Sequence, residues 1–398
     1  MSKKKRNNID ILAIVLTIFV VGSALILYGA VGVNKKSEPD VSEAVPIEIP
    51  TEPDPIIIVG PGEMEEYNAS EESEPESLLQ EAETEETEIS LLFGGDVYLS
   101  SHVLNAYDTA GGISGVVDEE FRQIIQESDY FMVNQEFPFS SRGTAAEDKQ
   151  FTFRLPPERV RILQDMGVDM VTLANNHSMD YGAEALLDSC QTLDEAGIRH
   201  IGAGADMKEA RGLETVEIKG KTIGFLGASR VIPVYEWTAG PDTPGLAITY
   251  NPSMLIEDIA AAKQICDYVV VYVHWGKEKS EIPEEYQKTM GRQYIEAGAD
   301  VVIGSHPHVL QGIEYYQGKP IVYSLGNFVF GSKIPRTMLL QVNLGEGGIT
   351  MKAYPGSSLA GYTAVEKNPE EVSAFYEKLH NMSVNIVIDD QGYISGIN

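Results

Sequence analysis

The chain has 398 residues, 43% of them hydrophobic, and a formal net charge of −31. This length suffices for a large folded domain with additional segments, and the acidic balance excludes nucleic acid or another polyanion held by bulk charge. The two cysteines, Cys190 and Cys266, are too few for a disulfide scaffold or a cysteine-based zinc site. We expect two buried free thiols; the alternative is one disulfide outside the cell.

The N-terminal segment predicts a membrane anchor. Residues 1–10 carry four basic side chains and are expected in the cytoplasm, because residues 11–33 follow them without a single charge. As a helix this stretch would be roughly 35 Å long, enough to cross a bilayer core. The alternative is a cleaved signal peptide, whose apolar core is usually shorter. The first interpretation describes a single-pass protein of the cell membrane with its bulk outside the cell.

Residues 34–88 are expected to form an acidic linker. Between residues 37 and 88 there are 18 Asp or Glu, several prolines and no Lys or Arg. Such a segment buries too little apolar surface to offset the entropy lost on ordering, so we expect a disordered and extended stalk. A tail that binds cations or a partner is the alternative.

From residue 89 onward, short apolar runs alternate with stretches of amphipathic helical spacing. The helical stretches are residues 157–166, 183–196, 253–265 and 284–297. This alternation predicts an α/β domain with a largely parallel sheet. After residue 336 the pattern favours hairpins at 338–353 and 384–394, with a helix over 369–379 between them. We therefore assign residues 89–336 to the main domain and residues 337–398 to a β-rich completion of it.

Six of the apolar runs end on polar residues that suit a metal ion. These residues are Asp96, Glu136, Asn176 with His177, His274, His306 with His308, and Asn327. In α/β sheets, ligands bind beyond the carboxyl ends of the strands, so these residues are expected to converge although they span more than 200 positions. Carboxylates, an amide and imidazoles suit Mn, Zn, Fe or Mg.

His306 and His308 give the sharpest signal. Two imidazoles placed two residues apart beyond a strand can face one cleft, and Pro307 restricts the backbone between them. The alternative is a pair of surface-loop histidines. For His274, which follows six β-forming residues, the competing interpretation is a packed core histidine.

The segment Asn175-Asn176-His177 offers an amide beside an imidazole, and Asp180 follows closely. A helix start is the alternative, and both interpretations can hold together. His177 suits a general acid because histidine titrates near neutral pH. Glu278 could accept a hydrogen bond from a substrate or from a ligating histidine. Asn327 is equally consistent with a pocket residue and a turn residue.

Taken in order, six motifs resemble the CapA family of poly-gamma-glutamate capsule synthesis proteins, also called PgsA-like. The motifs are Gly95-Asp96, Asn134-Gln135-Glu136, residues 175–182, residues 274–278, residues 304–308 and residues 324–330. This family is related to calcineurin-like metallophosphoesterases. The resemblance implies a four-layer β-sandwich flanked by helices, with one or two divalent metal ions at the strand ends.

The phosphoesterase pattern implies a role for each matching residue. A first metal would be bound by Asp96 and His308, Glu136 would bridge, and a second metal would be bound by Asn176, His274 and His306. The same pattern makes His177 the general acid. From their positions at the strand ends, and not from that pattern, we also assign Asp180 and Glu278 to catalysis and Asn134, Asn175, Trp275 and Asn327 to the substrate pocket. Two departures weaken the first metal and ordinary phosphoesterase activity: Tyr98 stands where a histidine is usual, and Glu136 where an aspartate is usual.

The leading interpretation is a membrane-anchored factor of poly-gamma-glutamate, capsule or envelope polymer synthesis. Its metal-dependent hydrolase-like site would act on a phosphoester or on a γ-glutamyl amide. The second interpretation is a non-catalytic accessory or export component that holds polymer carboxylates through the metal, because an acidic domain would otherwise repel them. The third is an adhesion or envelope-structure domain. Expected partners are the lipid bilayer, an anionic envelope polymer or its precursor, and membrane-bound synthase or export subunits.

Overall fold

The computed structural model describes residues 88–397. The expected membrane segment at residues 11–33 and the linker up to residue 87 lie outside this range. Among the helices of residues 88–397, none combines the length and the apolar character that a bilayer crossing requires. Cys190 and Cys266 are buried and unpaired, as expected.

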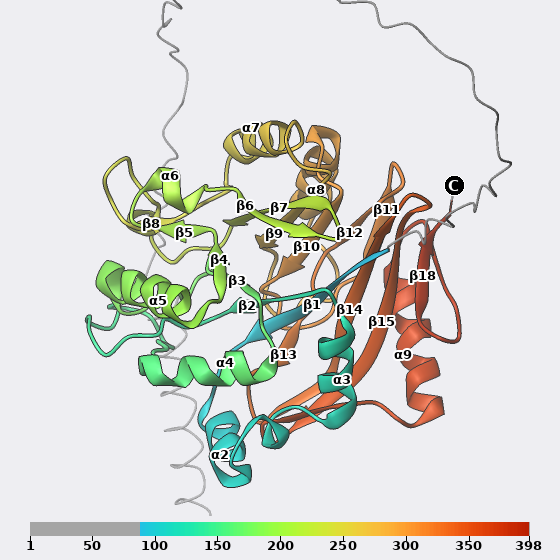
Figure 1. The fold of residues 1–398 in the computed structure, drawn as a ribbon, viewed down its shortest axis with the longest axis horizontal. Coiled ribbons are helices and arrows are strands. Elements are labelled where there is room, and N and C mark those ends of the chain that lie inside the picture. Colours follow the sequence, from blue (N-terminus) through green and yellow to red (C-terminus); the bar gives the residue numbers. More distant parts are fainter. Residues whose placement is uncertain (1–87, 398) are drawn as a thin grey trace, which may run out of the picture. The chain divides into compact units, whose positions relative to one another are not determined.

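Two β-sheets form the centre of the described domain (Figure 1). The ten-stranded sheet has the order β17-β18-β15-β14-β1-β2-β3-β4, with β13 added beside β1 and β16 beside β15. Its strands are β1 (Ile89–Val97), β2 (Tyr130–Gln135), β3 (Met170–Thr172), β4 (Arg199–Ile201), β13 (Asn327–Val329), β14 (Lys333–Gly345), β15 (Gly348–Leu359), β16 (Tyr362–Val365), β17 (Ile386–Ile388) and β18 (Tyr393–Gly396).

The second sheet has six strands in the order β11-β12-β10-β9-β7-β6. They are β6 (Glu214–Ile218), β7 (Lys221–Ser229), β9 (Tyr268–His274), β10 (Val301–Ser305), β11 (Ile313–Tyr316) and β12 (Lys319–Val322). A small two-stranded sheet pairs β5 (Ala203–Gly204) with β8 (Gly245–Leu246).

The largely parallel sheet predicted from strand–helix alternation is wrong, because both large sheets are mixed, whereas the two facing sheets agree with the sandwich that the resemblance implied. Strands β1 to β4 are parallel to one another, as are β7, β9, β10 and β12. The hairpin β14–β15 joins the first sheet, because β14 pairs antiparallel with β1 from Ile89 to Phe93. The boundary drawn at residue 336 therefore falls inside β14. Both sheets bury apolar side chains on each face. Because all these strands therefore have similar apolar sequences, the pattern alone does not show which strands belong to the same sheet.

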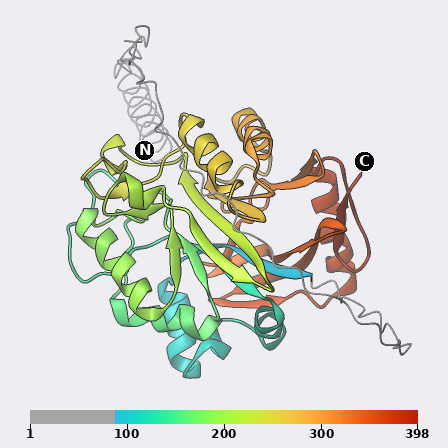
Figure 2. The same ribbon diagram turned by 45° about the horizontal axis from the view of Figure 1, so that its top comes forward.

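The sheets face each other across an apolar layer that includes Phe93, Met132, Tyr272 and Ile303. Most helices cover the outer faces (Figure 2), whereas the C-terminal helix packs Phe375 and Leu379 into this inner apolar cluster. The helices are α2 (Ser101–Ala110), α3 (Glu119–Glu127), α4 (Arg161–Met166), α5 (Gly182–Ala196), α6 (Met207–Ala210), α7 (Ser253–Ala262), α8 (Glu285–Ala297) and α9 (Pro369–Met382), with 3-10 turns at Ile113–Gly115, Pro157–Val160 and Tyr235–Trp237.

The helices expected from amphipathic spacing are present. Two of them end at glycines with positive φ, Gly197 at 74° and Gly298 at 122°. Glycine adopts this conformation without a steric penalty and so ends a helix readily. The helix expected over residues 253–265 ends earlier, at Ala262, and the stretch at 157–166 begins as a 3-10 turn.

Candidate metal centre

The carboxyl ends of strands from both sheets meet at one buried site. Asp96 lies near the end of β1, Glu136 directly follows β2, His274 ends β9 and His306 follows β10. Each of these side chains is at most 4% exposed. The two sheets are joined here by close contacts: Asn134 Nδ2 lies 3.3 Å from His274 Nδ1, and His308 Nδ1 lies 3.3 Å from Asp96 Oδ2. The convergence expected from the sequence is therefore present in the structure.

The approach of β1 to a neighbouring loop depends on glycine. A β-carbon at Gly95 would lie 1.9 Å from the carbonyl oxygen of Gly326. The next residue, Asp96, donates its backbone N–H to that same oxygen at 2.7 Å. Gly95 therefore permits the close backbone approach that positions the Asp96 carboxylate.

Asn134 holds the two carboxylates of the site together. Its Nδ2 donates to Asp96 Oδ1 at 2.8 Å and to Glu136 Oε1 at 3.1 Å. The other oxygen of each carboxylate, Asp96 Oδ2 and Glu136 Oε2, is buried without a hydrogen-bond partner. One ligand atom each from Asp96, Glu136 and His308 lies within 4.8 Å of the others. His308 lies 3.3 Å from Asp96 Oδ2 and 3.9 Å from Glu136 Oε2 but forms a hydrogen bond of normal geometry with neither oxygen. Two buried carboxylate oxygens without a hydrogen bond suit a bound cation.

A second group of candidate ligands adjoins the first and shares His308 with it. Glu278, His306 and His308 also offer ligand atoms within 4.8 Å of one another. His306 Nδ1 is buried without a hydrogen-bond partner, and the His306 ring centroid lies 4.7 Å from that of His274. His274 Nε2 lies 2.8 Å from Asn176 Oδ1 and 3.7 Å from Glu136 Oε1.

The electrostatics of the site also suit a cation. Burial and the neighbouring Asp96 raise the pKa of Glu136 well above its usual range. Burial alone would lower the pKa of His308, but Glu136 and Asp96 outweigh this effect and raise it to about 9. Burial and His308 lower the pKa of His306 to about 4. Burial and the neighbouring histidines His306 and His308 place the pKa of His274 well below normal.

These shifts have one meaning for metal binding. The raised pKa values of Glu136 and His308 mean that protons are held at these two groups, whereas the lowered pKa values keep His274 and His306 neutral. Neutral imidazole is the form that binds a metal, and a cation bound at Glu136 and His308 would displace the protons held there. The residues present therefore fit a divalent ion.

His177 lies beside this site in a network of its own. Its Nδ1 lies 2.8 Å from Asp180 Oδ2, and Phe153 stacks on the imidazole with ring centroids 4.4 Å apart. Lys149 makes an ion pair with Asp180, donates to the backbone carbonyl of Asn176 and lies 3.1 Å from His177 Nδ1. Lys149 was not among the predicted site residues, because a single lysine in an aperiodic loop gives no signal in the sequence.

Several predicted pocket residues have other positions. Trp275 is fully buried among α7 and α8 and donates Nε1–H to Tyr323 O at 2.9 Å, so its assignment to the substrate pocket is wrong. Asn134 and Asn175 have no exposed surface. Asn175 donates to Asn134 Oδ1 at 3.0 Å and accepts from the His177 backbone N–H at 2.9 Å, so it braces the loop and does not line a pocket.

The remaining predicted residues lie at the edge of the site. Asn327 is half-buried, and its Oδ1 lies 2.8 Å from His308 Nδ1. Glu278 is exposed, with its carboxylate near His306 and His308. Tyr98 stacks on Phe153 with centroids 3.9 Å apart, and so the position where a histidine was expected contributes packing.

The fold and the site define an α/β protein with a candidate divalent metal centre where the strand ends of two sheets meet. Residues 90–332 match the model of the family described as bacterial capsule synthesis protein PGA_cap, and the chain belongs to this family. The resemblance seen in the six motifs is thereby confirmed.

Two relatives and one solved structure show how far this similarity extends. The PGA biosynthesis protein CapA of Bacillus subtilis is 34% identical over 265 residues, which cover 65% of this chain and 69% of that protein. The capsule biosynthesis protein CapA of Bacillus anthracis is 30% identical over 306 residues, covering 71% and 72%. The NAD nucleotidase NadN of Haemophilus influenzae is 15% identical, with a TM-score of 0.41 over 76% of this chain and 64% of that one. This last likeness is too distant to bear on activity.

Proposed function

We propose that this chain acts in the synthesis of poly-gamma-glutamate or a related capsule polymer through a metal-dependent hydrolase-like site in a metallophosphoesterase-type sandwich. The observation that carries the proposal is the convergence of three buried, unpartnered atoms, Asp96 Oδ2, Glu136 Oε2 and His306 Nδ1, around His308. A structural cluster would normally satisfy such atoms internally. The bond cleaved or transferred would be a phosphoester or a γ-glutamyl amide.

The candidate ligands divide between two positions. Asp96, Glu136 and His308 would hold one divalent ion, and Asn176, His274 and His306 would hold a second. Such ions, when bound, supply Lewis-acid polarisation of a phosphoryl or carbonyl oxygen. Manganese, zinc, iron and magnesium all suit this set of nitrogen and oxygen ligands.

His177 is the group that would move a proton. Its shorter contact, to the Asp180 carboxylate, assigns the ring proton to Nδ1 and leaves Nε2 to exchange a proton with substrate. Burial lowers the pKa of His177 in spite of Asp180, so the resting imidazole is neutral near pH 7. In this arrangement Nε2 would accept a proton from the attacking water and then donate it to the leaving group.

A second candidate function is a non-catalytic accessory role in the same pathway. It is favoured by Tyr98, which packs on Phe153 and supplies no imidazole to the first metal position. A single ion would then hold a polymer carboxylate against an acidic domain and would not activate a nucleophile. The proposal also places the domain outside the cell on an N-terminal membrane helix, next to an anionic polymer and membrane-bound synthase or export subunits.

The test measures the metal content of the purified full chain in wild type, in His306→Ala and in the control His102→Ala, whose histidine is exposed and outside the site. Hydrolysis of a generic phosphodiester and of poly-γ-glutamate is followed with added Mn²⁺. Near-stoichiometric metal and turnover that are both lost only in His306→Ala would support the enzyme. Metal without turnover would favour the accessory role, and absence of metal in the wild type would refute both.

A further inference from the structure

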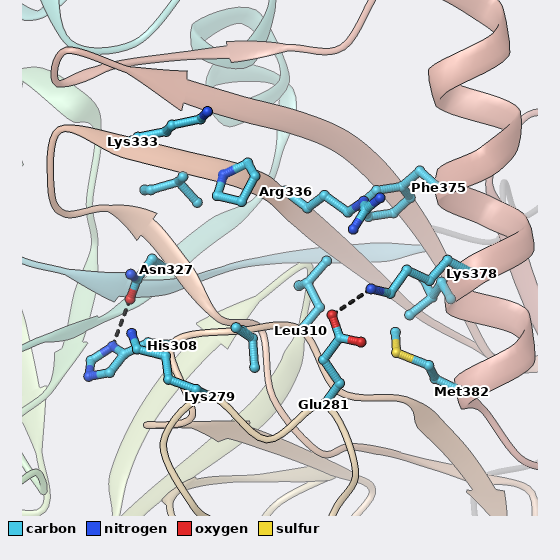
Figure 3. A pocket seen from close by; sticks show the side chains of 14 residues that line it. Lys279, Glu281, His308, Leu310, Asn327, Lys333, Arg336, Phe375, Lys378 and Met382 are labelled. Carbon is cyan, nitrogen blue, oxygen red and sulfur yellow. Dashed lines mark hydrogen bonds and ion pairs between the residues drawn. The ribbon is translucent and has the colours of Figure 1, made fainter.

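A cavity of about 280 Å³ opens directly beside the candidate metal centre (Figure 3). His308 and Asn327 line one end of it. From there it extends to α9, where Phe375 and Met382 line the other end. A molecule bound in this cavity would therefore lie within reach of the metal ligands.

The lining of this cavity is basic, although the chain as a whole is strongly acidic. It contains Lys279, Lys333, Arg336 and Lys378, against the single carboxylate of Glu281. Glu281 is already paired with Lys378. In the described part of the chain, no carboxylate lies within ion-pair distance of the other three cations, whereas most basic side chains elsewhere have an acidic neighbour. We name this feature the basic cavity.

Apolar side chains separate the cations of the basic cavity. Leu310, Ile334 and Phe375 are buried and line it. The cations come from separate segments: Lys279 follows β9, Lys333 and Arg336 lie on β14, and Lys378 lies on α9. The cavity therefore offers single positive charges at intervals, with apolar surface between them.

We infer that the basic cavity binds a stretch of an anionic polymer whose carboxylates are separated by methylene groups. The bound polymer would extend along the cavity to the candidate metal centre. Separate lysines match single negative charges, and the apolar lining matches the methylenes between them. A phosphate polymer would favour several donors gathered at one point, which the cavity lacks. The inference rests on the proposed function, because it names the substrate class of the same site.

The experiment measures binding of a fluorescently labelled γ-linked glutamate decamer to the full chain by anisotropy, in EDTA and in Mn²⁺. The variants are Lys333→Glu and Arg336→Glu, both exposed and outside the candidate metal ligands. The matched control is Lys208→Glu, an exposed lysine on α6 on the opposite side of the described domain (Figure 1). We expect each cavity variant to weaken binding about three- to tenfold, the scale of one or two exposed ion pairs, and the control to have no effect. Added salt should weaken wild-type binding more than variant binding.

Failure of this inference can be told from failure of the proposed function. Binding in EDTA that is weakened only by the cavity variants supports the inference even if no turnover is found. Equal affinities for wild type and cavity variants, or an equal loss in Lys208→Glu, would overturn it. So would tighter binding of a polyphosphate of equal charge that depends on Lys333 and Arg336. Metal content should stay at the wild-type level in both cavity variants, which shows that the metal centre is intact.

Discussion

His306 and His308 both have a left-handed backbone, with φ of 98° and 57° on either side of Pro307. A residue with a β-carbon is strained in this region by about 1–3 kcal/mol, and two such residues in one turn are uncommon. The turn brings both imidazoles toward Asp96 and Glu136. Backbone strain at this turn indicates that the position of the two imidazoles serves the candidate site at a cost in the stability of the local backbone.

Replacing His308 with glycine should give a more stable metal-free protein than replacing it with alanine. Glycine adopts φ of 57° freely, whereas alanine keeps the strain, and we expect a difference of about 1 kcal/mol in the free energy of unfolding. Urea unfolding in EDTA measures it. Both variants lose the same imidazole, so a His308→Ala protein as stable as His308→Gly would contradict the interpretation.

Asn134→Asp should destabilise the metal-free protein and make it dependent on metal. The change replaces the amide that donates to Asp96 and Glu136 with a third buried carboxylate, which we expect to lower the free energy of unfolding by about 3 kcal/mol. Saturating Mn²⁺ should restore part of this loss, because the folded state gains the binding free energy. Thermal unfolding with and without Mn²⁺ tests this. Asn343→Asp, a buried change on β14, should show no rescue.

Lys149 and Asp180 should be coupled in stability. Lys149→Met leaves the Asp180 carboxylate buried without its cation, and Asp180→Asn leaves the ammonium without its anion. Each single change is expected to cost about 3 kcal/mol, and the double change about 2 kcal/mol less than their sum. A double-mutant cycle by urea unfolding measures the coupling. Additivity within about 0.5 kcal/mol would show that the ion pair does not hold the His177 loop.

The metal-free protein should lose stability in acid partly through His306. The pKa of His306 is lowered from 6.5 to about 4 in the folded protein. Below pH 6.5 the unfolded chain therefore binds a proton at His306 that the folded chain does not bind, and the free energy of unfolding falls. Between pH 7 and pH 5 this amounts to about 2 kcal/mol. The raised pKa of His308 acts in the opposite direction, so the comparison is between wild type and His306→Gln. The variant should show the shallower pH dependence, and parallel curves would refute the assignment.

The sequence identified the strand ends well because the signal there is local. Each apolar run is short, and the polar residue that follows it marks where the strand leaves the core. In the register between the parallel strands β9 and β10, Ser305 lies opposite His274, so His306 follows at the same edge of the sheet. The convergence therefore does not depend on the conformation of the connecting loops.

Trp275 shows where the same reasoning was incomplete. Side chains alternate across a strand, so His274 and Trp275 face opposite sides of the second sheet. His274 points between the sheets, and Trp275 packs under α7 and α8 with Val271 and Val273. The alternation of side chains along residues 268–275 could have predicted that His274 and Trp275 lie on opposite faces of the sheet.

Local patterns could not have predicted the role of Lys149 or which strands form each sheet, although the family resemblance implied a sandwich. Lys149 reaches Asp180 through a loop whose path depends on tertiary packing. Assignment of strands to sheets depends on partners far apart in the chain, as in the pairing of Leu92 with Gln341. No local pattern encodes either relationship.

The position of β1 also determines when the metal centre can form during biosynthesis. One edge of β1 is covered by β2, but the other is covered by β13 and β14, which are made more than 200 residues later. The Asp96 carboxylate is thus fixed on both sides only after most of the domain has emerged. Closure of so long a loop is slow, so the complete set of candidate ligands forms only at a late stage of folding.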